Sequence, residues 1–212
     1  MRRLIRVFPR RNRATPDDEL ARFGPPGLFD EADEVHVSVT FKADKAIAES
    51  LAEQWRVVTQ SVHVGGVAYD DASLEFIPGR YVKPGYTITS RGCPRRCWFC
   101  GVWKKWPTVN AMPIYDGWNV LDDNVLAAPR DHVEAVFSML RRQKRADWPG
   151  WDGRIEFTGG LEALSLQDYQ VDLLASLRPP SQQKYRPPEE WRAFQRTWVR
   201  PAIIHASEPV AA

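Results

Sequence analysis

The stretch Glu34–Gly66, EVHVSVTFKADKAIAESLAEQWRVVTQSVHVGG, decides the expected fold class. After the initial glutamate, valine and then phenylalanine alternate with polar residues, which is the period of a β-strand. Ile47, Leu51 and Trp55 then recur four residues apart, which places them on one face of a helix. A second valine-rich segment follows and ends at a glycine pair. Strand, helix and strand in this order predict a βαβ unit, which we assign to residues 31–84.

The same alternation continues toward the C-terminus. Short strand-like segments lie near residues 86–90, 118–121 and 154–158. An amphipathic helix that begins at Pro129 separates the last two. Strands that alternate with helices are typical of a parallel sheet with helices packed outside it. We therefore expect an α/β fold over residues 85–178, with polar loops at the carboxyl ends of the strands.

Both ends of the chain differ in composition from these segments. Six arginines lie within the first 13 residues and a GPPG sequence follows at Gly24–Gly27, so we expect a basic, irregular arm over residues 1–30. Such an arm is either a solvated tail or a grip for the phosphates of a nucleic acid. Residues 179–212 contain two Pro-Pro pairs and one short amphipathic segment, and we expect a proline-rich tail.

The bulk composition is that of an ordinary globular protein. The 212 residues are 43% hydrophobic and 26% charged, and the net charge of +2 provides no overall field that favours nucleic acid. No apolar run approaches the ~20 residues needed to span a bilayer, and the N-terminus lacks the apolar segment of a secretion signal. We therefore expect a cytoplasmic protein without membrane contact.

All three cysteines of the chain lie within eight residues, at Cys93, Cys97 and Cys100. A closed zinc site needs four protein ligands, so a histidine or carboxylate from elsewhere would have to complete it. A redox pair of Cys97 and Cys100 would leave Cys93 unused. An iron–sulfur cube held by three thiolates leaves one iron open for another ligand, which accounts for the odd number of cysteines.

The spacing of these cysteines resembles the signature of the radical S-adenosylmethionine (radical SAM) family, Cys-x3-Cys-x-aromatic-Cys in the loop after the first barrel strand. The match includes Phe99, and the preceding TITSRG corresponds to that strand and its glycine. The resemblance implies that Cys93, Cys97 and Cys100 bind a [4Fe-4S] cluster and that S-adenosylmethionine binds its fourth iron. It also implies that Phe99 lies near the adenine of S-adenosylmethionine.

The resemblance further implies a reaction class. Electrons from a donor such as a flavodoxin or ferredoxin would pass through the cluster and cleave S-adenosylmethionine. The resulting 5′-deoxyadenosyl radical would abstract a hydrogen atom from a substrate that the sequence does not identify.

A second motif, VLDDN, resembles the Asp-Asp-Asn sequence at the end of the second strand in cobalamin-associated radical SAM enzymes. On that resemblance Asp122, Asp123 and Asn124 face the cofactor. Because Asp and Asn are also common in turns, a strand-to-helix turn is the alternative. The Asp-x-His-x-x-Gly signature of cobalamin binding is absent, and we do not expect cobalamin.

A third motif, FTGGLEA, resembles the Gly-Gly-Glu sequence that binds the amino group of S-adenosylmethionine at a strand end in this family. The resemblance implies cofactor contacts from Gly159, Gly160 and Glu162. Leu161 separates Glu162 from the glycines, which departs from the family pattern.

The three expected strands amount to about half of the barrel that this family forms, preceded by the βαβ unit. The explanations are a truncated or frameshifted copy, a half completed by a partner chain, or a variant whose N-terminal strands extend the sheet. The leading hypothesis is a radical SAM enzyme. The alternatives are an inactive truncated copy and a zinc-binding, non-enzymatic module that contacts nucleic acid through the arginine arm.

Overall fold

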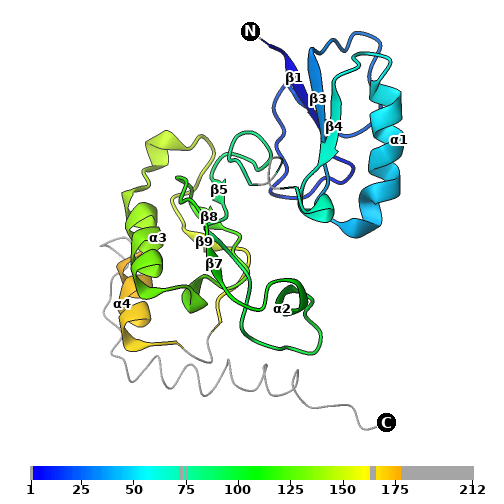
Figure 1. Ribbon diagram of the computed structural model, residues 1–212. Helices are drawn as coiled ribbons and strands as arrows, with labels where there is room; N and C mark the ends of the chain where they lie inside the picture. Colours follow the sequence, from blue (N-terminus) through cyan, green and yellow to red (C-terminus); the bar gives the residue numbers. More distant parts are fainter. Residues whose placement is uncertain (1, 72–73, 75, 163–165, 178–212) are drawn as a thin grey trace. The chain divides into compact units, whose positions relative to one another are not determined.

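The computed structural model describes residues 2–71, 74, 76–162 and 166–177. The chain divides between Tyr86 and Thr87 into two compact units, which we call unit 1 and unit 2. Each unit contains parallel strands joined through a helix, so the fold is α/β (Figure 1). None of the helices that the structure describes has the length and apolar character that crossing a membrane requires.

Unit 1 is built on a four-stranded parallel sheet in the order β2-β1-β3-β4. Its strands are β1 (Leu4–Val7), β2 (Ala21–Arg22), β3 (Glu34–Ser38) and β4 (Val62–Gly65). The helix α1 (Lys45–Trp55) connects β3 to β4 and packs against the sheet (Figure 1). The βαβ crossover predicted from Glu34–Gly66 is therefore present. Short 3-10 helices, η1 (Lys42–Asp44) and η2 (Val67–Tyr69), precede α1 and follow β4.

One face of this sheet forms the core with α1. Val35 and Val37 are fully buried beside Trp55, and Ala48 and Ala52 let the helix approach closely. Ile47, predicted to lie on the buried face, is half exposed instead. The buried stripe is shifted by one position because small alanines, rather than a large side chain, contact the sheet.

The expectation of an irregular arm over residues 1–30 is wrong for β1 and β2. Ile5 and Val7 in β1 are fully buried, because β1 lies between β2 and β3 in the sheet. Arg6 is 5% exposed, donates to the carbonyl oxygens of Gly79 and Arg80, and forms an ion pair with Asp18. The high arginine content of this region concealed the alternating apolar residues of a strand.

A second arginine of this region is also paired. The Arg10 guanidinium makes two hydrogen bonds to the Asp44 carboxylate, at 2.8 and 2.7 Å. This ion pair holds the pKa of Asp44 below its ordinary value, mainly through the hydrogen bond from Arg10. Arginines that stabilise the unit in this way are not available as a loose grip for phosphates, which weakens the nucleic-acid alternative.

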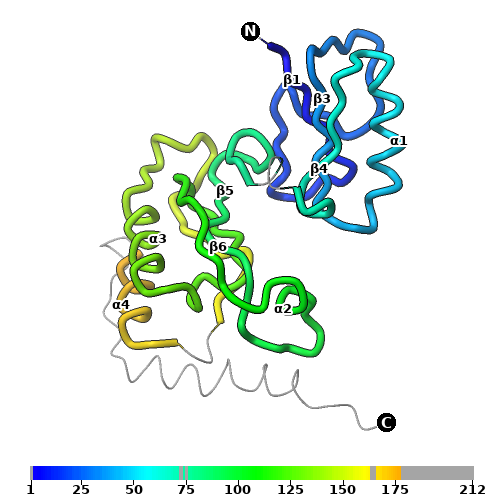
Figure 2. The backbone as a smooth tube through the Cα atoms, in the orientation of Figure 1, coloured from blue at the N-terminus to red at the C-terminus, as the bar shows by residue number. Residues whose placement is uncertain are grey.

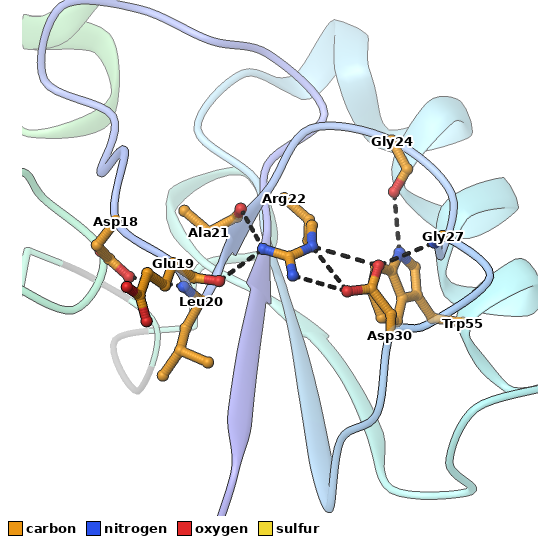
Figure 3. A network of polar contacts seen from close by, with 9 residues as sticks. All are labelled: Asp18, Glu19, Leu20, Ala21, Arg22, Gly24, Gly27, Asp30 and Trp55. Atoms are coloured by element: carbon orange, nitrogen blue, oxygen red, sulfur yellow. Dashed lines mark hydrogen bonds and ion pairs between the residues drawn. The ribbon is translucent and has the colours of Figure 1, made fainter.

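The loop between β2 and β3 is fixed by a polar network (Figure 3). Arg22 donates to both oxygens of Asp30, and the backbone N–H of Gly27 donates to Asp30 Oδ2 at 2.8 Å. At the other side of the loop, Trp55 Nε1 donates to the carbonyl oxygen of Gly24 at 2.9 Å. The GPPG sequence is therefore an ordered connection rather than an unstructured spacer.

Unit 2 contains a three-stranded sheet in the order β5-β8-β9. The strands are β5 (Tyr86–Thr87), β8 (Asn119–Val120) and β9 (Glu156–Phe157). The helix α3 (Arg130–Arg142) connects the parallel strands β8 and β9 along the chain, and α4 (Asp168–Ser176) packs beside α3 (Figure 1). Short 3-10 helices, η4 (Val125–Ala127) and η5 (Arg145–Asp147), precede and follow α3.

The amphipathic helix predicted after Pro129 is confirmed. Val133, Val136, Phe137 and Leu140 are at most 2% exposed and form the core of unit 2 with residues of α4 and β9. The expected proline-rich tail, residues 179–212, lies outside the described residues.

Between β5 and β8, the chain leaves the sheet in a long excursion. The strands β6 (Ser90–Arg91) and β7 (Asn110–Ala111) pair in antiparallel fashion and close its base. Residues 92–109, which we call the cysteine loop, lie between them and include the single-turn helix α2 (Val102–Lys105) (Figure 2).

Over the described residues, neither of the two larger sheets closes into a barrel.

Candidate functional site

The base of the cysteine loop is packed tightly. Gly92 has a φ of +107°, and a Cβ added there would lie 1.9 Å from the carbonyl oxygen of Thr108. The backbone N–H of Cys93 donates to the carbonyl oxygen of Trp106 at 3.1 Å. Glycine is required at position 92 because both the backbone conformation and the close approach exclude a side chain.

Asp122 connects the end of β8 to the strand that enters the cysteine loop. Its side chain is buried, and its carboxylate accepts hydrogen bonds from the backbone N–H and the hydroxyl of Thr89 and from the hydroxyl of Ser90, each at 2.6 Å. These short bonds to a buried carboxylate fix residues 89 and 90 against β8.

Asp123 continues this connection by one residue. Its carboxylate accepts a hydrogen bond from the backbone N–H of Gly92 at 2.9 Å and pairs with Arg91 at 3.0 Å. Both charged side chains are less than one fifth exposed, so solvent screens the pair only weakly.

Asn124 contacts a cysteine directly. Its Nδ2 donates to Cys93 Sγ at 3.3 Å, and the residue is 2% exposed. Its Oδ1 is buried and has no hydrogen-bond partner among the described residues. An unpaired buried acceptor of this kind costs about 1–3 kcal/mol.

The glycine motif approaches the same region from β9. A Cβ added to Gly159 would lie 2.0 Å from the carbonyl oxygen of Asp122, so this glycine lets the two strand ends meet. Gly160 has a φ of +88°, which favours glycine. Glu162 forms an ion pair with Arg95 of the cysteine loop at 3.2 Å. Both glycines thus have a conformational reason to be there, and cofactor contacts from them and from Glu162 stay predictions.

The three cysteines differ in their surroundings. Cys93 and Cys100 are partly buried, whereas Cys97 is exposed. The backbone N–H of Cys100 donates to the carbonyl oxygen of Cys97 at 3.1 Å, which places both in one turn. Within the part of the chain that the structure describes, no three Cys, His, Asp or Glu side chains are arranged to hold a metal ion together. The three thiols are therefore close along the chain, but they do not form one metal-binding group in the described structure.

The aromatic residues of the loop tip lie in solvent. Trp98 and Phe99 are 72% and 64% exposed and contact each other edge to face, with ring centroids 5.6 Å apart. The predicted position of Phe99 near an adenine stays a prediction. Trp103 Nε1 donates to the carbonyl oxygen of Cys97 at 2.9 Å and so braces the middle of the loop.

The donor set fits an iron–sulfur cluster in its chemistry. Three cysteine thiols are the ligand type of a cluster that leaves one iron open. Their placement fits only in part: Cys93 is held by Asn124, but the three thiols do not form one group that could hold a metal ion. The exposed side chains of Trp98 and Phe99 show that the loop tip has no packed core that would oppose a rearrangement.

The partners of Asp122, Thr89 and Ser90, were not among the predicted site residues. Both are fully buried although each carries a hydroxyl group, as does Thr87, whose hydroxyl donates to the carbonyl oxygen of Tyr115. Because a buried hydroxyl needs a hydrogen-bond partner, three polar residues in the short strand-like segment TITS were a usable signal for a nearby acceptor.

Comparison with models of known protein families, with curated proteins and with solved structures gives no match for this chain.

Proposed function

We propose that this chain is a radical SAM-type protein that binds a [4Fe-4S] cluster through Cys93, Cys97 and Cys100. S-Adenosylmethionine would bind the fourth iron, and the β5-β8-β9 sheet would be about half of a radical SAM barrel. One observation carries this proposal. The three motifs that resemble the family lie far apart in the sequence, yet residues from all three bond to one another around the cysteine loop.

Residues of this chain would have separate roles in binding the cluster. Cys93, Cys97 and Cys100 would supply the thiolates. Arg95 and Glu162 would lie beside the cluster as an ion pair that holds the loop against the end of β9 without adding net charge. When bound, the cluster would supply the electron that cleaves S-adenosylmethionine to methionine and a 5′-deoxyadenosyl radical.

The proposal also implies a partner and a compartment. A low-potential electron donor such as a flavodoxin or ferredoxin would reduce the cluster. Three free thiols, of which Cys97 is exposed, and a cluster sensitive to oxidation suit the reducing cytoplasm.

The test is reconstitution of the full chain with iron and sulfide in the absence of oxygen. We expect a brown protein with about four irons per chain, and release of 5′-deoxyadenosine when a strong reductant and S-adenosylmethionine are added. Cys97→Ala should lose the cluster, whereas Thr108→Ala, a matched exposed position on the same loop, should keep it.

Three results would change the proposal. A colourless protein with one bound zinc would replace it with a zinc site. A cluster retained by Cys97→Ala would remove the ligand assignment. A protein that binds iron but never cleaves S-adenosylmethionine would leave a cluster-binding scaffold without catalysis.

A further inference from the structure

Asn124 has a position that a purely structural asparagine does not need. It is the residue that precedes η4, where an asparagine side chain commonly caps the first turn. The Asn124 side chain makes no such capping bond in the described structure and is directed instead to Cys93 Sγ, at 3.3 Å. Its backbone φ of −162° is extended and is open to any residue, so the backbone does not require asparagine either.

A second buried asparagine in the same unit provides a comparison. Asn119 in β8 is fully buried, and both ends of its amide have partners: Nδ2 donates to Glu156 Oε2 at 2.8 Å, and Oδ1 accepts from the backbone N–H of Thr158 at 3.4 Å. Asn124 is equally buried, but its Oδ1 has no described partner. Asn119 therefore stabilises the sheet. Asn124, in contrast, leaves its Oδ1 without a described partner, and the only described hydrogen bond of its side chain is the one from Nδ2 to the Cys93 thiol.

We infer that Asn124 is a positioning residue that fixes the Cys93 thiol before any metal is bound. Asp122 and Asp123 hold the two residues on either side of β6 in the same way, so Cys93 emerges from a clamped segment. Cys97 and Cys100 then join this fixed donor when their turn closes. The inference deepens the proposed function, and it rests on that function only for the identity of the metal group.

Because Cys93 is held in place and Cys97 and Cys100 are not, we expect Cys93 to be the fixed donor to which the other two thiols are added. One donor held in place lowers the entropy lost when the other two are brought to it, because only the loop tip has to be ordered. Once a cluster is bound, an N–H donor beside a ligating sulfur also raises its reduction potential, since it stabilises negative charge on the sulfur.

The test uses the metal-free full chain and does not need a reconstituted enzyme. Brief alkylation with iodoacetamide, followed by mass spectrometry of each cysteine, should label Cys97 fastest and Cys93 slowest in the unmodified protein. Asn124→Leu should raise the labelling rate of Cys93 by roughly five- to tenfold, the factor that one hydrogen bond is worth, and leave that of Cys97 unchanged. Its midpoint of thermal unfolding should not fall, because the substitution removes an unpaired buried acceptor.

Asn119→Leu is the matched control, since it makes the same substitution at the other buried asparagine. It should lower the midpoint of thermal unfolding, because Glu156 loses its partner, and leave the slow labelling of Cys93 intact. Asn124→Ala, which removes the amide without adding an apolar side chain, should give the same selective labelling of Cys93 as Asn124→Leu.

The opposite pattern would overturn the inference. Unchanged labelling of Cys93 in a folded Asn124→Leu or Asn124→Ala would show that the amide does not hold the thiol. Loss of the folded state in both variants, or equal acceleration at all three cysteines, would show a structural role instead.

A second measurement separates this inference from the proposed function. If the unmodified protein takes up iron and sulfide, Asn124→Leu should show a lower iron content or a lower reduction potential than Asn119→Leu. If the unmodified protein takes up none, the proposed function fails, and the labelling result still decides whether Asn124 positions Cys93.

Discussion

Two sets of polar side chains, one in each unit, bond to different kinds of partner. In unit 1, Arg6, Arg10 and Arg22 pair with carboxylates or carbonyl oxygens of other segments and so join the strands and loops of the unit itself. In unit 2, Asp122, Asp123 and Asn124 all bond to the segment that enters the cysteine loop. The comparison teaches that these arginines join separate segments of unit 1, whereas Asp122, Asp123 and Asn124 hold the entry of one exposed loop in unit 2.

The largest expected effect tests the base of that loop. Gly92→Ala should destabilise unit 2 by about 3 kcal/mol or more, because the new Cβ would overlap the carbonyl oxygen of Thr108 at a positive φ. Chemical denaturation followed by circular dichroism measures the loss. Gly101→Ala, where a Cβ meets nothing within 4 Å, should change little. Equal effects at the two positions would break the contrast between a rigid base and an open tip.

The next largest effect is expected for Asp122, whose buried carboxylate holds the strand that enters the cysteine loop. Asp122→Ala removes the acceptor of three buried hydrogen bonds and should destabilise unit 2 by about 2–4 kcal/mol. Hydrogen exchange should rise at residues 87–92 and remain unchanged in the strands of unit 1. The control is Asp116→Ala, an exposed carboxylate 3.7 Å from Arg142, which should cost less than about 0.5 kcal/mol. Faster exchange throughout unit 1 would contradict a local role for Asp122.

A smaller effect is expected for a single polar contact within unit 1. Trp55→Phe retains most of a fully buried apolar side chain but loses the hydrogen bond to the carbonyl oxygen of Gly24. We expect a loss of about 1–2 kcal/mol, with faster hydrogen exchange in the loop between β2 and β3. Val57→Ala, at a position 82% exposed, should be neutral. If exchange in the loop did not change, the contact with Gly24 would not be what fixes it.

The smallest effect is a pH dependence of unit 1. His36 is buried, with Nδ1 2.5 Å from the Tyr81 hydroxyl and Nε2 2.8 Å from Glu34, and burial lowers its pKa below the ordinary value of 6.5 despite the opposing effect of Glu34. The unfolded chain therefore binds a proton more readily than the folded unit. Stability should decline as the pH falls below about 6.5, by no more than about 1.4 kcal/mol per pH unit.

Denaturation curves between pH 7.5 and pH 5.5 measure this dependence. His36→Gln should make the slope shallower over that interval, since the titrating group is removed. A slope that the substitution leaves unchanged would assign the pH dependence to other groups. Hydrogen-exchange protection factors at β8 and β9 of unit 2, which correct for the intrinsic pH dependence of exchange, should show no corresponding change.

The sequence predicted those elements whose periodicity is set by burial on one face. The crossover through α1 and the apolar stripe of α3 follow directly from repeated valine, leucine and phenylalanine positions. The strand β1 was not predicted because it is only four residues long and lies in a sequence rich in arginine. Its burial also depends on pairing with β3, which lies in another part of the chain. A strand that short acquires its identity from tertiary contacts rather than from propensity.

The candidate site was predictable in composition but not in arrangement. The spacing of the cysteines and the resemblance of the sequence to family motifs identified the cysteines and the Asp122–Asn124 segment as candidates. It did not reveal that these side chains hold the entry of the loop, because that depends on which strand ends become neighbours in the sheet. The exposure of Phe99 was equally hidden, since an aromatic residue in a loop has no repeating pattern that indicates its surroundings.

The antiparallel pair of β6 and β7 has a consequence for how this chain can vary. Because this pair and the packed loop base at Gly92, Cys93 and Trp106 close the excursion, residues can be inserted or removed at the loop tip without shifting the register of the sheet. The free-energy cost of closing such a loop, which comes from lost chain entropy, rises only slowly with loop length, by about 0.6 kcal/mol for each doubling. The scaffold can therefore accept longer or shorter versions of the thiol-bearing segment, and the chemistry at its tip can diversify while the strands stay constant.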